Sequence, residues 1–555
     1  MSKYEGARAR VAKPALWAAG IAALICGYGS DATAYTYQLD DQTEFNAHLT
    51  TTYTIGARTE HPSGKVTNAG IDPSTGYSTT VNYDDPDRNF KQGDLITNKL
   101  SAFLEAQLTH GEFGFKASAL AFYDDVYHRD NSNRSPGTVN KVGDWDDFTS
   151  DTRFVDGGNI RLYDLFGYGT VHPFDTDLSI RAGNQVVAWG ESLFFGNISL
   201  AQGPVDSTKG NVPGAEVKDI LLPVPQIAVN WGISDRVSLV GYYQFDFQPN
   251  ILDGVGGYFS RSDVVGPGAQ FSFSSTLLAP VFRAEDDMPS NQGQFGVGTT
   301  FTLNDVTSGG LYFIKYHDKN PLPLFELGPL LLAGSNTPIP AISVPRWYHE
   351  HYQDSIKLYG ASLSTMLGAV NVGAEFAYRD GAATLITTQV IGNALPQPTT
   401  LNLWQANLNA LYVMGSTPVS DSLSLTGEFS YNHVTHIDPF GQQGVEYSQL
   451  YKRDKDSFGV QLQAEFGYTD IFPGGWDLAV PFNLGSDLHG TPAYNGSLGA
   501  YSGQGDTRLG LGVNFRRLNN LEIGFVYNVF FGNYDPILRP LTDRDFALAT
   551  VKYTF

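Results

Sequence analysis

Segments in which polar and apolar residues alternate recur along the chain from Glu44 to its last residue. Within residues 98–109, every second residue from Leu100 to Leu108 is apolar, whereas Glu105 and Gln107 lie between them. A period of two places successive side chains on opposite faces of a β-strand, so each segment predicts a strand with one apolar face. Eighteen strands are predicted, at residues 44–57, 98–109, 111–126, 160–171, 176–189, 225–233, 236–247, 293–304, 309–317, 355–366, 369–380, 402–415, 421–433, 455–469, 475–485, 505–516, 519–531 and 544–555.

The links between these segments alternate between tight turns and long loops. The tight turns include His110-Gly111, Ser234-Asp235, Leu367-Gly368, Asp470–Gly474 and Arg517-Leu518. The long loops cover residues 58–97, 127–159, 190–224, 248–292, 318–354, 381–401, 434–454, 486–504 and 532–543. This rhythm is typical of an outer-membrane barrel with short periplasmic turns and long extracellular loops. The sequence therefore predicts an all-β fold, a single antiparallel transmembrane β-barrel of about 18 strands, with 14–16 as the alternative.

The last predicted strand ends on an aromatic residue. Phe555, Tyr553 and Val551 are apolar, whereas Thr554 and Lys552 between them are polar. In outer-membrane barrels the last strand closes against the first, and aromatic side chains lie at the membrane interface. We expect the barrel-assembly machinery to engage this strand, and outer-membrane lipid and lipopolysaccharide to surround the outer face.

The amino-terminal residues have the pattern of a secretory signal. Basic residues up to Lys13 precede an apolar run at 15–25 and the small residues Ala32-Thr33-Ala34. This pattern predicts a signal peptide at 1–34 and a mature barrel at 35–555. A membrane anchor is the alternative, but the run is short for a helix that spans about 30 Å of hydrocarbon. The single cysteine, Cys26, lies in this segment, which argues against a disulfide scaffold or a thiol enzyme.

Charge and motifs narrow the function classes. The chain has 35 Lys+Arg against 57 Asp+Glu, a net charge of −22, which disfavours nucleic acid as a partner. We find no G-x-S-x-G, P-loop or H-E-x-x-H motif, so we expect no enzyme and no cofactor. A soluble β-propeller or β-helix is the alternative fold, but no repeat of about 40 residues is present.

The loop around residues 320–347 is unusually apolar and rich in proline. Prolines disfavour a regular helix or a central strand, and an exposed apolar set of this size should be covered. We expect a constriction folded into the barrel or an apolar ligand site; packing on neighbouring loops is the alternative. The flanking histidines are interpreted as rim residues, and no metal site is predicted. The ligand-binding candidates are Leu322, Leu324, Phe325, Leu327, Leu330, Leu331 and Leu332, together with Phe194 and Phe195 of loop 190–224.

Charged residues also occur within or at the ends of the predicted strands. On the lipid face each basic residue would cost about 2–4 kcal/mol at the midplane, so we expect these side chains in the lumen. There they would form opposed rings that set selectivity, or they would pair and stiffen the wall. The residues are Arg161, Arg181, Glu191, Glu375, Arg379, Glu428, Glu465 and Arg508.

The block from Arg181 to Pro225 resembles an uncharacterised family of Gram-negative outer-membrane proteins, a domain of unknown function. The similar pieces are Arg181–Ser192, Pro204–Asp206, Val212–Lys218, Leu221–Pro225, Gly241–Gln244, Leu358–Ser362 and Leu541–Phe546. The resemblance covers the mature chain and assigns no active residues. It implies the handling of steroids, terpenes, alkanes or similar compounds beside a permease of the resistance-nodulation-division type and a periplasmic carrier.

Three functions follow as hypotheses for a protein of the bacterial outer membrane. The leading one is a channel or transporter for hydrophobic small molecules that works with an inner-membrane permease. The alternative is a structural or assembly partner of a permease system that handles surface lipids, and the third is a general porin. The loops at 190–224, 248–292 and 318–354 are the segments expected to fold over or into the lumen.

Overall fold

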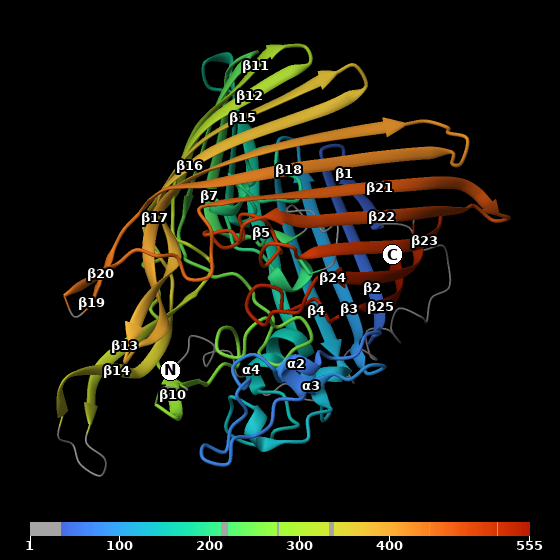
Figure 1. The fold of residues 1–555 in the computed structure, drawn as a ribbon. Helices are drawn as coiled ribbons and strands as arrows, with labels where there is room; N and C mark the ends of the chain where they lie inside the picture. Colours follow the sequence, from blue (N-terminus) through green and yellow to red (C-terminus); the bar gives the residue numbers. More distant parts are fainter. Residues whose placement is uncertain (1–34, 212–219, 275–276, 332–337, 443, 519) are drawn as a thin grey trace.

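The computed structural model describes residues 35–211, 220–274, 277–331, 338–442, 444–518 and 520–555. Eighteen strands form a closed antiparallel barrel, which confirms the predicted fold class and strand count (Figure 1). In ring order they are β2 (Thr43–Arg58), β3 (Leu95–His110), β4 (Phe113–Asp124), β5 (Gly158–Val171), β6 (Asp177–Gln185), β7 (Val224–Ser234), β8 (Val237–Gln244), β11 (Gln294–Asn304), β12 (Thr307–Tyr316), β15 (Ile356–Leu367), β16 (Val370–Val390), β17 (Asn393–Met414), β18 (Ser422–Ile437), β21 (Asp456–Phe472), β22 (Trp476–His489), β23 (Thr507–Arg517), β24 (Leu521–Phe531) and β25 (Phe546–Thr554).

The last strand closes the barrel against its first strand, as the sequence predicts. β25 pairs with β24 on one side and with β2 on the other, where Thr54 faces Thr550 and Thr52 faces Lys552. The short strand β1 (Tyr35–Asp40) pairs with the beginning of the same edge of β2. β25 and β1 together therefore cover most of this edge, which would otherwise carry unpaired backbone groups. The predicted signal peptide at 1–34 lies outside the described residues.

The two faces of the barrel wall have opposite polarity. On β17, the Leu408 side chain is 53% exposed on the outside, whereas its neighbours Asn407 and Asn409 are buried on the inside. Exposed apolar side chains recur on the other barrel strands, for example Leu363, Phe376 and Phe525. An apolar outer band around a closed barrel is the arrangement that a bilayer requires. The protein is an integral protein of the outer membrane.

No helix of the described residues is long and apolar enough to cross a membrane.

An arginine at an outward position should destabilise the barrel. We expect Leu408→Arg to lower the free energy of unfolding by about 2–4 kcal/mol, because the charge would face hydrocarbon. Urea unfolding of the protein in lipid vesicles measures this difference, and Leu408→Phe serves as the apolar control. Equal unfolding midpoints for the two variants would contradict the assignment of this face to lipid.

Short helices and a small second sheet lie beyond the long-loop end of the barrel (Figure 1). The helices there are α2 (Gly64–Thr67), α3 (Asp85–Asn89) and α4 (Ser150–Thr152), with the helical turns η2 (Asp125–His128), η3 (Pro136–Thr138), η4 (Arg153–Gly157) and η7 (Ser207–Lys209). Two further turns lie elsewhere: η5 (Pro173–Asp175) in the tight β5–β6 turn, and η6 (Ser199–Ala201) in the β6–β7 loop. The second sheet consists of β13 (Leu322–Leu331), β14 (Pro338–His351), β10 (Ala279–Arg283) and β9 (Phe271–Ser274), and β19 (Phe440–Gln442) pairs with β20 (Val445–Tyr447).

The proline-rich loop is a β-hairpin, which corrects the expectation of a loop without regular strands. β13 is the edge strand of the second sheet, so its prolines need no partner on the open side. β14 pairs with β10 only at Trp347 and Tyr348, after its last proline, Pro345. Every proline of the hairpin therefore lies where its strand has a single neighbour.

A second correction concerns residues 381–401, which were expected to be a long loop. β16 and β17 continue through this segment to a tight turn at residues 391–392. The register shifts between Arg379 and Ala382, and Gly381 has a φ of +81°. Beyond this bulge β16 no longer pairs with β15, and β17 no longer pairs with β18. The two strands therefore form a two-stranded extension past the barrel rim.

The β13–β14 hairpin packs on this extension. The backbone N–H of Phe325 donates to Oε1 of Gln397 on β17 at 3.1 Å, and Nε2 of Gln397 donates to the carbonyl of Phe325 at 2.8 Å. The hairpin thus lies beyond the rim of the barrel, at the long-loop end (Figure 1).

Candidate functional site in the barrel lumen

Part of the loop between β6 and β7 crosses the barrel interior. We name residues 189–202 the lumen segment. It begins close to β6 and contacts β16, β17 and β18, which lie across the ring from β6. The side chains of Phe195, Asn197 and Ile198 are fully buried. The segment therefore fills space in the lumen instead of covering the mouth.

Glu375 of β16 accepts hydrogen bonds from one end of the lumen segment and from its middle. The backbone N–H groups of Glu191 and Ser192 donate to its Oε2 at 2.8 and 2.9 Å, and the Ser192 hydroxyl donates to the same atom at 2.8 Å. The N–H of Ile198 donates to Oε1 at 2.5 Å. A Cβ built on Gly190 (φ +99°) would lie 2.6 Å from Oε2 of Glu375, so the close approach requires glycine there.

Glu428 of β18 holds the residues between these two contacts. The N–H groups of Leu193, Phe194 and Phe195 donate to its carboxylate at 3.2, 2.5 and 2.9 Å. Hydrogen bonds to charged groups contribute about 1.5–3 kcal/mol each. The carboxylates of Glu375 and Glu428 thus accept hydrogen bonds from six backbone N–H groups, those of residues 191–195 and 198. Neither carboxylate forms an ion pair with an arginine among the described residues.

Donor side chains of the wall bind the carbonyl groups of the same segment. Arg379 donates to the carbonyl of Asn197 at 2.9 Å, and Nδ2 of Asn407 donates to the carbonyl of Phe195 at 2.6 Å. Nδ2 of Asn409 donates to the carbonyl of Glu191 at 2.6 Å. The polar wall therefore matches both the donors and the acceptors of the segment backbone, which fixes its position.

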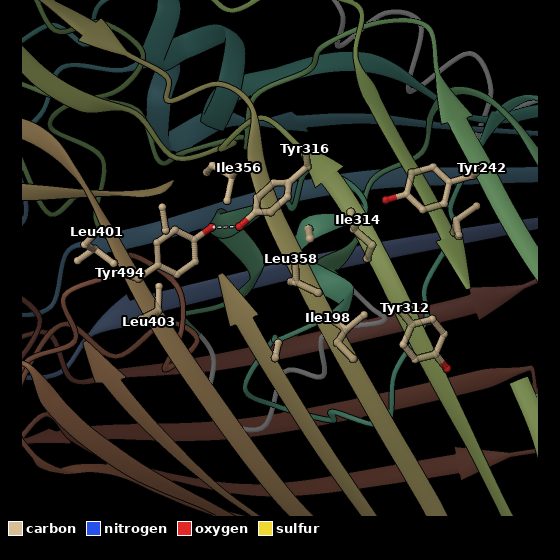
Figure 2. Close-up of a cluster of buried hydrophobic side chains, with 14 of the residues drawn as sticks. Ile198, Tyr242, Tyr312, Ile314, Tyr316, Ile356, Leu358, Leu401, Leu403 and Tyr494 are labelled. Atoms are coloured by element: carbon tan, nitrogen blue, oxygen red, sulfur yellow. Dashed lines mark hydrogen bonds between the residues drawn. The ribbon is translucent and has the colours of Figure 1, made fainter. Parts of the chain in front are cut away.

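The side of the lumen next to Ile198 is apolar. We name this surface the apolar wall: Tyr242, Tyr312, Ile314, Tyr316, Ile356, Leu358, Leu401 and Leu403, all buried. Figure 2 shows Ile198 beside Leu358, with the hydroxyls of Tyr316 and Tyr494 facing each other at 3.2 Å. A Cβ built on Gly360 would lie 2.8 Å from Cδ1 of Ile198, so the contact is tight. Barrel lumens of porins are polar, and this one carries a continuous apolar surface.

The link between β22 and β23 also packs on the apolar wall from inside the barrel. Tyr494 belongs to the link between β22 and β23, and the guanidinium of Arg379 lies 5.2 Å from the centre of its ring. Thr384 donates to the carbonyl of Ala493 at 2.8 Å, and Gln405 donates to the carbonyl of Ser497 at 3.0 Å. The apolar wall is thus enclosed between two inward loops that share the anchors on β16 and β17.

The structure brings four of the predicted lumen charges together and separates the other four. Glu375, Arg379 and Glu428 contact the lumen segment, and Glu191 belongs to it. The remaining four lie elsewhere on the barrel: Arg161 pairs with Asp206 at 3.2 Å, Arg508 pairs with Asp506 at 2.8 Å, the Arg181 guanidinium lies 6.0 Å from the ring centre of Phe166, and Glu465 is half-buried on β21.

The predicted apolar ligand candidates fall into two separate places. Phe194 and Phe195 are buried in the lumen segment. Leu322 is buried, and Leu324, Phe325, Leu327 and Leu330 are half-buried, on β13 beyond the rim of the barrel. The side chain of Leu331 and all of Leu332 lie outside the described residues.

Sequence reasoning did not identify the amide side chains that bind the segment carbonyls or the apolar wall. Gln405, Asn407 and Asn409 recur at every second position of β17. Three amides on one face of a transmembrane strand are a signal that could have pointed to a polar anchor in the lumen.

These features define an integral outer-membrane β-barrel whose lumen is occupied by its own β6–β7 loop. The chain belongs to the family described as "Protein of unknown function (DUF1302)", whose model matches residues 15–555. No curated protein matches the chain.

Several solved structures of outer-membrane proteins are similar to the chain over most of its length. OccAB4 of Acinetobacter baumannii has 10% identity and a TM-score of 0.41, covering 93% of this chain and 100% of that chain. OccK5 (OpdH) of Pseudomonas aeruginosa has 10% identity and a TM-score of 0.39, covering 92% and 98%. The outer membrane channel DcaP of Acinetobacter baumannii has 9% identity and a TM-score of 0.35, covering 94% and 99%.

Proposed function

We propose that the protein is an outer-membrane channel for hydrophobic small molecules and that the lumen segment is its gate. The observation that supports this most directly is the apolar wall inside the barrel, covered by Ile198 of the segment. When the segment moves away, the uncovered surface would favour an apolar solute by about 25 cal/mol per Å² of area buried. The steroid, terpene and alkane classes are the proposed substrates.

The anchoring of the segment supports a gate. Only hydrogen bonds and packing hold it to β16–β18, and these contacts can break and re-form, whereas a wall strand is fixed by its ladder on both sides. A general porin requires an open aqueous lumen. The buried residues of the lumen segment occupy that space here, which disfavours the porin hypothesis.

A substitution on the apolar wall tests the proposal. We expect Leu358→Gln to reduce uptake of a fluorescent sterol into vesicles containing the protein at least several-fold, because an amide would interrupt the apolar surface. Leu363→Gln is the matched control, since Leu363 lies on the same strand and is 40% exposed on the outer face. Equal uptake by both variants would contradict the proposal, and nanosiemens conductance of the wild type without sterol uptake would favour a general porin.

The hairpin β13–β14 is proposed as an outer capture surface for the same solutes. The hairpin lies at the long-loop end of the barrel (Figure 1), and its apolar side chains, such as those of Phe325 and Leu327, are half-buried. We expect Phe325→Ser with Leu327→Ser to slow sterol uptake without changing the amount taken up at equilibrium. A stopped-flow measurement of uptake separates these two quantities, and an unchanged initial rate would exclude a capture role.

At the periplasmic end, we propose that a permease and a lipid carrier exchange the solute with the channel. Co-purification of a permease with the intact protein tests this partnership. A permease partner without sterol binding would instead favour the role of a structural or assembly component.

A further inference from the structure

Three buried carboxylates meet in the extracellular loops, away from the lumen segment. Asp84 and Asp85 lie at the beginning of α3, in the loop between β2 and β3, and Asp263 lies in the link between β8 and β9. Their exposed fractions are 0%, 3% and 0%. One oxygen of each residue lies within 4.8 Å of the corresponding oxygens of the other two. Such proximity of three carboxylates buried from solvent is unfavourable unless a positive charge compensates it.

The hydrogen bonds of these carboxylates use only part of their acceptor capacity. Oδ2 of Asp84 accepts from Nε of Arg88 at 2.6 Å and from the hydroxyl of Thr80 at 2.7 Å, and Oδ2 of Asp263 accepts from the N–H of Asp85 at 3.1 Å. The Oδ1 atoms of all three aspartates are buried and have no hydrogen-bond partner. Three buried carboxylate oxygens therefore have no protein partner at one place, which points to a ligand-binding site.

Nearby cations do not neutralise the cluster. Of the described residues, only Arg88 forms an ion pair with any of the three carboxylates. Lys141 and Arg544 act on them at longer range, but the Lys141 ammonium donates to the carbonyl of Asp147 and Arg544 donates to carbonyls of the neighbouring loop. Burial raises the pKa of Asp85 and Asp263 well above the ordinary range. Repulsion from Asp263 and Asp84 raises the pKa of Asp85 further, and repulsion from Asp84 raises that of Asp263.

A buried neutral oxygen lies one helical turn after Asp85. Asn89 of α3 is 5% exposed, its Nδ2 donates to the carbonyl of Gly256 at 3.0 Å, and its Oδ1 is buried without a partner. A Cβ built on Gly256 would lie 2.7 Å from Nδ2 of Asn89 and 3.9 Å from Oδ2 of Asp85. The Asn89 amide and the Asp85 carboxylate therefore both lie next to Gly256, and a side chain at position 256 would collide with the amide.

We propose that Asp84, Asp85 and Asp263 bind one Ca²⁺ ion. The donors are all hard oxygens, without histidine or cysteine, and they come from two links far apart in the chain, which suits the irregular coordination of Ca²⁺ better than the strict octahedron of Mg²⁺. The ion would join the β2–β3 loop to the β8–β9 link and so order the extracellular mouth. Extracellular Ca²⁺ sites bind with dissociation constants of about 10⁻⁴–10⁻³ M, and we expect a value in this range.

Calorimetric titration of the full-length protein, treated with EDTA and dialysed, tests the site. We expect one Ca²⁺ per chain, weaker binding of Mg²⁺, and an increase of several degrees in the temperature at which the folded form is lost on a gel. The double variant Asp85→Asn with Asp263→Asn should lose at least tenfold in Ca²⁺ affinity and no longer respond in the thermal assay. Asp144→Asn, at an exposed position of the β4–β5 loop, is the control that should bind like the wild type.

Two outcomes would overturn the proposal. One is the absence of Ca²⁺ heat and of a thermal shift in the wild type. The other is a Ca²⁺ affinity that is unchanged in the double variant, which would assign the binding to other acidic groups. If the double variant does not fold, Asp263→Asn alone, which keeps both residues of α3, provides the same comparison.

Discussion

Replacing Glu428 with alanine is expected to open the lumen. The variant removes the acceptor for the N–H groups of Leu193, Phe194 and Phe195, three hydrogen bonds to a charged group that contribute about 1.5–3 kcal/mol each. Without this anchor the middle of the lumen segment is free to leave the wall. We therefore expect single-channel conductance in planar bilayers to rise several-fold over the wild type, with larger fluctuations between levels.

Glu465→Ala provides the matched control for this experiment. Glu465 lies on the neighbouring strand β21, is half-buried, and has no contact with the segment among the described interactions. We expect its conductance to equal that of the wild type. Equal conductance of the Glu428→Ala variant and the wild type would show that the carboxylate does not hold the gate.

The second large effect is expected at a buried ionic cluster beside the strands that close the barrel. Arg58, at the end of β2, pairs with Asp87 at 3.1 Å and with Asp543 at 3.4 Å, and Arg544 lies 3.5 Å from Asp87. All four side chains are nearly inaccessible to solvent. Arg58→Ala leaves two carboxylates with one arginine in a buried site, which should cost about 3–5 kcal/mol of unfolding free energy.

Urea unfolding in lipid vesicles measures this loss. Arg236→Ala is the control, because Arg236 is exposed in the tight β7–β8 turn and should change stability little. Through its ion pairs with Asp87 and Asp543, Arg58 also joins the β2–β3 loop to the residues just before β25. An Arg58→Ala variant as stable as the control would show that the cluster does not stabilise the closed barrel.

The barrel could be predicted from the sequence because polar and apolar residues alternate along its strands. Each of the eighteen predicted segments overlaps a strand of the closed ring, and the closing strand was predicted from its alternation and its aromatic end. The extension of β16 and β17 was missed because the bulge at Gly381 shifts the pattern. The hairpin β13–β14 was missed because its prolines disfavour a strand except at an edge, and edge positions are not visible in a sequence.

The lumen site was predictable only in part. Glu375 and Glu428 were expected to face the lumen, but their partners are backbone groups of a segment far away in the chain, which no side-chain pattern reveals. The apolar wall could not be predicted because both faces of its strands carry apolar residues. On β15 the inward Leu358 is fully buried and the outward Tyr359 is 49% exposed, and both are apolar, so alternation does not distinguish the two faces.

A reversible cross-link between the lumen segment and the wall tests the proposed gate most directly. A Cβ built on Gly360 would lie 2.9 Å from Cγ1 of Ile198, which is one C–C bond from the Cβ of Ile198, so the two Cβ atoms are no farther apart than the upper limit of about 4.5 Å found in disulfides. The variant Ile198→Cys with Gly360→Cys has no competing cysteine except Cys26, in the predicted signal peptide. We predict that oxidation abolishes sterol uptake, that reduction restores it, and that neither single-cysteine variant responds. Equal uptake by the oxidised and reduced forms of a fully cross-linked protein would contradict the gate.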